Sequence, residues 1–216
     1  MAKNRGFICG ITGRLGNTTS GYYRGKYITR ILAEKVSNPR TRRQETVRAR
    51  FKELVALASA FMPAFDDSGA KGLTKYSRHA RHTEFNCFTH LNWEKVSASN
   101  PFDVEISYAD LVMGKGKLPQ VSFAAPSFEE TNTVQCAFIG NSDQEGADSS
   151  DSVYLFLYSP ELRKGLLGAP VSRSEQTITV STPLGWNGTT VHVYGLTLND
   201  KGEAAESQYV GSGTIN

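Results

Sequence analysis

The stretch TVHVYGLTLNDKGEAAES, residues Thr190–Ser207, indicates the fold of the C-terminal half of this sequence. Over Val191–Leu198, large apolar residues alternate with smaller or polar ones, which is the two-residue period of a strand. Asn199–Gly202 has turn chemistry, and Glu206–Val210 again has strand character. These residues predict two antiparallel strands joined by a tight turn.

Similar strand-like runs precede this pair, separated by turns and by the acidic loop Asn141–Asp151. Strands at this spacing, with few helical signals among them, predict an antiparallel sandwich. We place a domain boundary near Lys117, which gives a basic hairpin and helical region over 1–117 and a β-sandwich domain over 118–216. The runs are Asp103–Tyr108, Val121–Ala124, Val134–Ile139, Val153–Tyr158 and Thr177–Ser181.

The residues before this domain carry a helical pattern. Asn38 is suited to cap a helix, Pro39 to its first position and Pro63 to its end. A second, weaker helix is predicted within 74–92. The long helix is predicted to bury one apolar stripe, formed by Val47, Phe51, Leu54, Val55, Ala58 and Met62.

The N-terminal segment is rich in glycine, β-branched and aromatic residues, which predicts short strands near 6–12 and 21–30 around a turn at Leu15–Asn17. Its glycines do not form a phosphate loop. Gly21–Tyr27 has the wrong spacing and lacks the hydroxyl residue of a Walker motif, and Gly10–Gly16 does not match the dinucleotide fingerprint.

Charge is strongly segregated along the chain. Residues 1–52 hold 13 Lys/Arg and 2 acidic residues, a net charge of +11. Residues 53–100 hold five of each, and residues 101–216 hold 6 Lys/Arg and 14 acidic residues, a net charge of −8. The overall charge of +3 therefore conceals a basic N-terminal segment and an acidic C-terminal half.

The basic segment is the candidate functional site. Arginine binds phosphate in a bidentate manner and tyrosine stacks on bases, a mixture typical of surfaces that bind nucleic acid without sequence specificity. The same charge also suits the acidic half of a neighbouring copy, and a solvated helix face is the simplest alternative. The candidate contact residues are Arg14, Tyr22, Tyr23, Arg24, Lys26, Arg30, Arg40, Arg42, Arg43, Arg48 and Arg50.

No pattern in the sequence predicts an enzyme, a cofactor or a metal centre. His79, His82, Cys87 and His90 are zinc-ligand types, but on one helix they span about 16 Å, too far for one tetrahedral ion. A metal shared by His79, His82 and a group from elsewhere stays open. There is no Gly-x-Ser-x-Gly motif, and His192 lies in an alternating strand, where it is expected to face solvent.

The N-terminus lacks the continuous apolar core of a secretory signal, because Gly10 directly follows Phe7–Cys9. We therefore expect a cytoplasmic protein without a signal peptide and without a membrane span. Cys9, Cys87 and Cys136 are then expected to be reduced, buried side chains.

Two resemblances extend this interpretation. Thr190–Ser207 resembles the last hairpin of a fibronectin type III or immunoglobulin-like sandwich. The whole chain is similar to an uncharacterised bacterial family, a domain of unknown function. That likeness rests on the Gly-rich basic N-terminus with Tyr22–Lys26, the helix start Asn38-Pro39-Arg40-Thr41, and the C-terminal sandwich. It implies the same architecture and transfers no activity.

The predicted fold class is α+β, with a Gly-rich N-terminal β segment and two helices followed by an antiparallel immunoglobulin-like β-sandwich. We expect a non-enzymatic structural protein that forms homo-oligomers and contacts nucleic acid or an acidic neighbouring subunit through the basic segment. A component of a phage or another assembled particle fits this plan. The alternative is a monomeric binding module whose sandwich loops hold a protein or glycan.

Overall fold

The computed structural model describes residues 12–23, 25–33, 38–68 and 83–216. The chain divides into two compact units, and the division falls between Thr41 and Arg42. The boundary drawn from the sequence near Lys117 does not coincide with this division, because the helices share a hydrophobic core with the sheet that follows them.

The first unit is an antiparallel meander of three strands, β1 (Gly13–Leu15), β2 (Thr18–Tyr23) and β3 (Lys26–Ile31). The turn predicted at Leu15–Asn17 joins β1 to β2. The single strand predicted over 21–30 is wrong, because the chain turns back beside Gly25, whose φ of +78° favours glycine. The strand predicted over 6–12 lies almost wholly outside the described residues.

Helix α1 (Arg42–Ser68) opens the second unit, and both of its predicted ends are wrong. Arg40 has a φ of +46°, which a first helical turn does not allow, so the helix begins after it and not at Asn38. At the other end the helix continues past Pro63. A proline removes one backbone hydrogen bond from a helix, and here it does not end the helix. Two residues earlier, Phe61 is fully buried in the core and holds this part of the helix in place.

The second predicted helix is confirmed as α3 (Glu84–Asn92). Thr83 caps it, since its hydroxyl oxygen accepts a hydrogen bond from the backbone N–H of Asn86 at 3.3 Å. Three short 3-10 helices lie among the described residues of this unit, at Trp93–Lys95, Tyr108–Asp110 and Leu184–Trp186.

The strands of the second unit form a hairpin and two larger sheets. The hairpin pairs β4 (Val96–Asn100) with β5 (Asp103–Ile106). The three-stranded sheet has the order β11-β7-β6, from β6 (Ser122–Phe123), β7 (Thr133–Ile139) and β11 (Thr177–Ser181). The five-stranded sheet consists of β8 (Ser152–Ser159), β9 (Lys164–Leu167), β10 (Val171–Ser172), β12 (Thr190–Leu198) and β13 (Gln208–Thr214). Its strand order is β10-β8-β12-β13, and β9 also pairs with β8.

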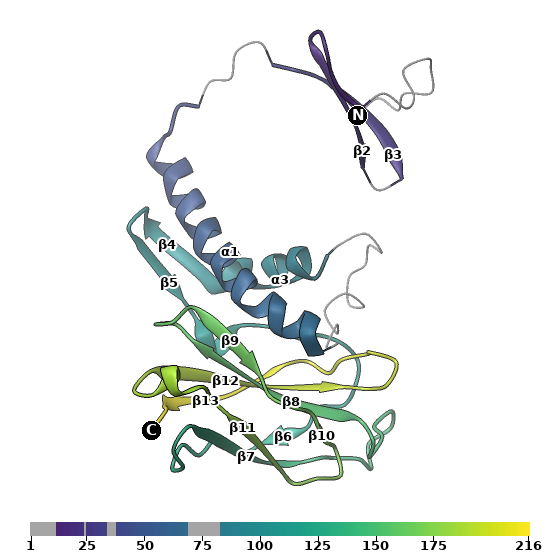
Figure 1. Cartoon of the computed structure of the whole chain (residues 1–216), viewed down its shortest axis with the longest axis vertical. Coiled ribbons are helices and arrows are strands. Elements are labelled where there is room, and N and C mark those ends of the chain that lie inside the picture. The colour runs from purple at the N-terminus through teal and green to yellow at the C-terminus, as the bar shows by residue number, and fades with distance from the viewer. Residues whose placement is uncertain (1–11, 24, 34–37, 69–82) are drawn as a thin grey trace. The chain divides into compact units, whose positions relative to one another are not determined.

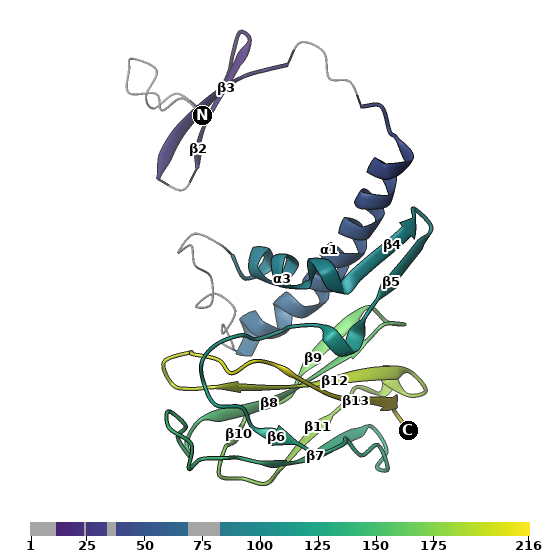
Figure 2. The same ribbon diagram turned by 180° about the vertical axis from the view of Figure 1, so that it is seen from behind.

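The five-stranded sheet lies in the middle of the second unit and is buried on both faces. Helices α1 and α3 cover one face and the three-stranded sheet covers the other (Figures 1 and 2). Along β8, the aromatic side chains Tyr154, Phe156 and Tyr158 belong to the helix-side core. The aliphatic residues that alternate with them, Val153, Leu155 and Leu157, belong to the core between the sheets. Burial on both faces explains why this strand is a continuous apolar run.

The fold class is α+β, as predicted. The hairpin predicted from Thr190–Ser207 is present in part. The N–H of Gly202 donates to the Asn199 carbonyl at 2.8 Å and β12 pairs antiparallel with β13, but the second strand, predicted over Glu206–Val210, spans Gln208–Thr214. The sequence interpretation missed β4, β9 and β10, which are short; β4 alternates apolar and polar residues, but only with Val96 and the small Ala98 on its apolar side.

Candidate nucleic-acid interface

The register of the meander places its basic side chains on one face. Arg14 pairs with Thr19, Thr19 pairs with Arg30, and Tyr23 pairs with Lys26. Paired residues in antiparallel strands point to the same side of a sheet, and successive residues alternate between sides. Arg14, Tyr23, Lys26 and Arg30 therefore share one side, and all four are exposed. We call these four residues the basic face.

The opposite side of the meander carries a different chemistry. Tyr22 and Tyr27 pair across the strands there, with ring centroids 4.9 Å apart, and Leu15 and Ile31 accompany them. Tyr22 was predicted to act together with the basic residues. The structure places it on the side of the sheet away from Arg14, Lys26 and Arg30.

The basic face contains a shallow hollow of about 330 Å³ at Gly21. A Cβ atom at this glycine would meet nothing within 4 Å, and Ile28 lies directly across from it. Arg30 and Tyr23 both line the hollow. A guanidinium that binds phosphate and a ring that stacks on a base are thus brought to the two ends of one recess.

Arg14 is oriented by the turn beside it. Its Nε donates to the Gly16 carbonyl at 3.2 Å, which uses one of the five N–H donors of the guanidinium. Lys26 lies at the far end of the basic face, at the start of β3. The three cations are thus spread over the meander and do not form one cluster, as suits contacts to successive phosphates.

The arginines of α1 divide into two kinds. Arg42, Arg43 and Arg48 are exposed in the first two turns of the helix, and Arg40 is exposed just before it. The guanidinium of Arg50, in contrast, lies 4.1 Å from the centroid of the Trp93 ring, and its Nη2 donates to the Trp93 carbonyl. Arg50 therefore holds α1 to the segment after α3. Arg24, also predicted, lies outside the described residues.

The buried face of α1 differs from the predicted stripe. Leu54 and Ala58 are fully buried as predicted, and Leu57 and Phe61 join them. Val47 and Phe51 are about half exposed, because this half of α1 extends beyond the five-stranded sheet (Figure 1). An apolar hollow of about 370 Å³ results, which we call the α1 hollow; it is lined by Val47, Arg48, Phe51, Lys52 and Val55.

Two of the four residues considered for metal binding lie in the described part of the chain, and they differ in exposure. On α3, Cys87 is buried whereas His90 is exposed, and His79 and His82 lie outside the described residues. Within residues 12–23, 25–33, 38–68 and 83–216, no three His, Cys, Asp or Glu side chains are placed to share an ion. Burial raises the pKa of the Cys136 thiol to about 11, so this cysteine is not a reactive thiolate at neutral pH.

His192 does not face solvent as predicted. Its ring stacks on Tyr108 with centroids 4.3 Å apart, and its Nδ1 lies 3.1 Å from the Tyr209 hydroxyl oxygen. Burial lowers the pKa of this histidine. The prediction failed because Tyr108 and Tyr209 cover this part of β12, and a strand's own alternation does not show what packs on it.

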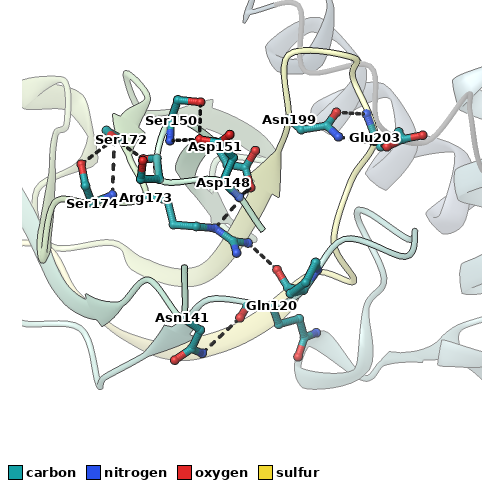
Figure 3. A network of polar contacts seen from close by, with 12 residues as sticks. Gln120, Asn141, Asp148, Ser150, Asp151, Ser172, Arg173, Ser174, Asn199 and Glu203 are labelled. Atoms are coloured by element: carbon teal, nitrogen blue, oxygen red, sulfur yellow. Dashed lines mark hydrogen bonds and ion pairs between the residues drawn. The ribbon is translucent and has the colours of Figure 1, made fainter. Parts of the chain in front are cut away.

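The acidic loop Asn141–Asp151 is anchored at its end by a buried ion pair (Figure 3). Arg173 Nε lies 3.4 Å from Asp151 Oδ2, and both side chains are almost fully buried. The same guanidinium donates to the Pro119 carbonyl, and the backbone N–H of Asp148 donates to Asp151 Oδ2 at 3.0 Å. Sequence reasoning missed Arg173, because a single arginine between two short strands carries no sign of burial.

Among the helices in the described part of the chain, none combines the length and apolar character needed to cross a membrane. Comparison with curated proteins finds no match. A family model described as "Family of unknown function (DUF6266)" matches residues 10–211. The match takes in both units, including the meander that carries the basic face. The chain therefore belongs to the DUF6266 family of unknown function.

Proposed function

We propose that this protein is a non-enzymatic structural protein that self-assembles and binds nucleic acid through the basic face. The observation that carries the proposal is the register of the meander, which directs Arg14, Lys26 and Arg30 to one side. The exposed Arg42 and Arg43 of α1 add positive charge in the same region of the sequence.

The arrangement favours phosphate contacts over base recognition. The hollow at Gly21 is shallow and is lined by aromatic and hydroxyl side chains together with Arg30, so it suits a base stacked on a ring beside a phosphate. Contacts of this type bind nucleic acid without sequence specificity and weaken as salt concentration rises. A particle that packages nucleic acid, such as a phage, is one setting for a protein of this kind.

An acidic neighbouring subunit is the second candidate partner of the basic face. It is favoured by the net charge of −8 over residues 101–216. Contacts between unlike patches on successive copies generate rings or open arrays. Such an assembly dissociates in salt, and a nucleic acid competes with the acidic patch for the basic face.

Size-exclusion chromatography with light scattering, at low and high salt and with a single-stranded oligonucleotide, tests the proposal. We expect self-association and co-elution with the oligonucleotide at low salt. Arg14→Ser/Lys26→Ser/Arg30→Ser should abolish co-elution. Lys117→Ser/Lys164→Ser/Lys201→Ser removes the same charge from the second unit and should not. A monomer that ignores both salt and nucleic acid would overturn the proposal and favour the binding-module alternative.

A further inference from the structure

The tip of the β4–β5 hairpin presents a single aromatic ring to solvent. Phe102 is 98% exposed. Its backbone N–H donates to Asn100 Oδ1 at 2.9 Å, and the Ser99 hydroxyl donates to Asp103 Oδ2 at 2.5 Å. These bonds within the tip fix the turn. The backbone at Phe102 is therefore fixed, and its ring does not contribute to the core of its own chain.

The charges around this ring are opposite to those around the α1 hollow. Asp103 and Glu105 are both exposed on β5, and they point to the same side because they are two residues apart. The α1 hollow has an apolar floor flanked by Arg48 and Lys52. An apolar ring with an acidic rim thus matches an open apolar patch on one face of α1 with a basic rim, which is the complementarity found at protein–protein interfaces.

The two features lie near each other in the second unit. The hairpin runs beside the N-terminal half of α1, as both views show (Figures 1 and 2). In a two-fold dimer, each contact from a residue of the first copy to a site on the second copy is repeated from the second copy to the first. The tip of each copy then enters the hollow of the other, so the two contacts form together.

We propose that two copies of this chain form a two-fold dimer in which Phe102 of each copy occupies the α1 hollow of the other. This inference rests on the self-assembly in the proposed function and names the surfaces that carry it. Phe102 does not occupy the α1 hollow of its own chain, because its side chain is 98% exposed.

Sedimentation velocity over a range of concentrations, without nucleic acid, tests the dimer. Burial of one phenylalanine is worth on the order of tenfold in affinity, and the dimer buries it twice, so Phe102→Ser should raise the dissociation constant about 100-fold. Leu184→Ser is the matched control, because this residue is also highly exposed but lies on the sandwich. An unchanged dissociation constant for Phe102→Ser, or a wild-type chain that is monomeric throughout, would overturn the proposal.

A charge exchange tests the pairing of the two surfaces. Lys52→Glu places like charges opposite Glu105, and Glu105→Lys places like charges opposite Lys52, so each variant alone should dimerise about tenfold more weakly. An equimolar mixture should recover the wild-type dissociation constant, because both contacts in the mixed dimer again join opposite charges. No recovery in the mixture would contradict the exchanged contact.

Nucleic-acid binding is read out separately. Phe102→Ser retains Arg14, Lys26 and Arg30, so it should bind a short single-stranded oligonucleotide as the wild type does. Loss of the nucleic-acid contact and loss of the dimer contact are therefore distinguished, whereas a monomeric wild type would contradict both the dimer and the self-assembly in the proposed function. If Phe102→Ser weakens the dimer and leaves oligonucleotide binding unchanged, the dimer contact is supported. If Arg14→Ser/Lys26→Ser/Arg30→Ser binds the oligonucleotide as the wild type does, the proposed nucleic-acid contact is contradicted and the dimer contact is not.

Discussion

The guanidinium of Arg50 lies over the ring of Trp93, 4.1 Å from its centroid, and donates to the Trp93 carbonyl. This contact joins α1 to the segment that follows α3. It separates Arg50 from the other arginines in its part of the chain, because its guanidinium is already used within the protein. Arg42 and Arg43, two turns earlier, are exposed and available to a partner.

Replacing Arg50 should therefore cost stability. Arg50→Ala removes a cation–π contact and a hydrogen bond, so we expect the free energy of unfolding to fall by about 1–2 kcal/mol. Arg43→Ala should change it by less than about 0.5 kcal/mol. Urea denaturation followed by circular dichroism measures both, and equal losses in the two variants would contradict the distinction.

The ion pair between Arg173 and Asp151 gives a second stability prediction. Arg173→Met leaves the Asp151 carboxylate buried without its partner, so we expect a loss of about 3–5 kcal/mol. Arg173→Met/Asp151→Leu removes both charges and should cost less than the sum of the single substitutions. Strictly additive losses in a denaturant double-mutant cycle would show that the two charges do not interact.

Much of the fold was accessible from the sequence. The alternation in Val191–Leu198 and the turn at Asn199–Gly202 predicted the β12–β13 hairpin, since both the strand period and the turn chemistry are local. The ends of α1 were not accessible. They depend on the left-handed backbone of Arg40 and on the burial of Phe61, two residues before Pro63, and neither can be read from a local pattern.

The candidate site was accessible only in outline. Composition pointed to the basic segment, but only the register shows that Tyr22 faces away from Arg14 and Arg30. The partner of Arg50, Trp93, is 43 residues away in the sequence. Contacts over such distances arise from tertiary packing and leave no local pattern.

His192 should make stability sensitive to mild acid. Burial lowers its folded-state pKa below the ordinary value, so the unfolded chain takes up a proton first as the pH falls. Stability is therefore expected to be retained above about pH 6.5 and to decline below it. Thermal unfolding of wild type and His192→Gln between pH 7.5 and 5.5 measures this. An equal pH dependence in both proteins would assign the decline to other groups.

The first turn of α1 offers a trade between stability and binding. Cations near a helix N-terminus oppose the helix dipole, so Arg43→Glu should stabilise the fold by about 0.3–1 kcal/mol. The same substitution should weaken oligonucleotide binding if Arg43 contributes to the charged surface. Denaturation and fluorescence anisotropy on the same preparation test both effects. Arg43→Gln, which removes the charge without adding another, should lie between wild type and Arg43→Glu in both measurements.

The salt dependence of oligonucleotide binding tests the central claim most directly. Each phosphate contact on a single strand contributes about 0.7 to the slope of log K against log salt, so loss of three contacts should reduce the slope by about 2. Fluorescence anisotropy of wild type and Arg14→Ser/Lys26→Ser/Arg30→Ser, at several salt concentrations, gives both slopes. The account predicts weaker binding and this smaller slope in the variant. Equal affinity and equal slope would show that the basic face does not contact phosphate.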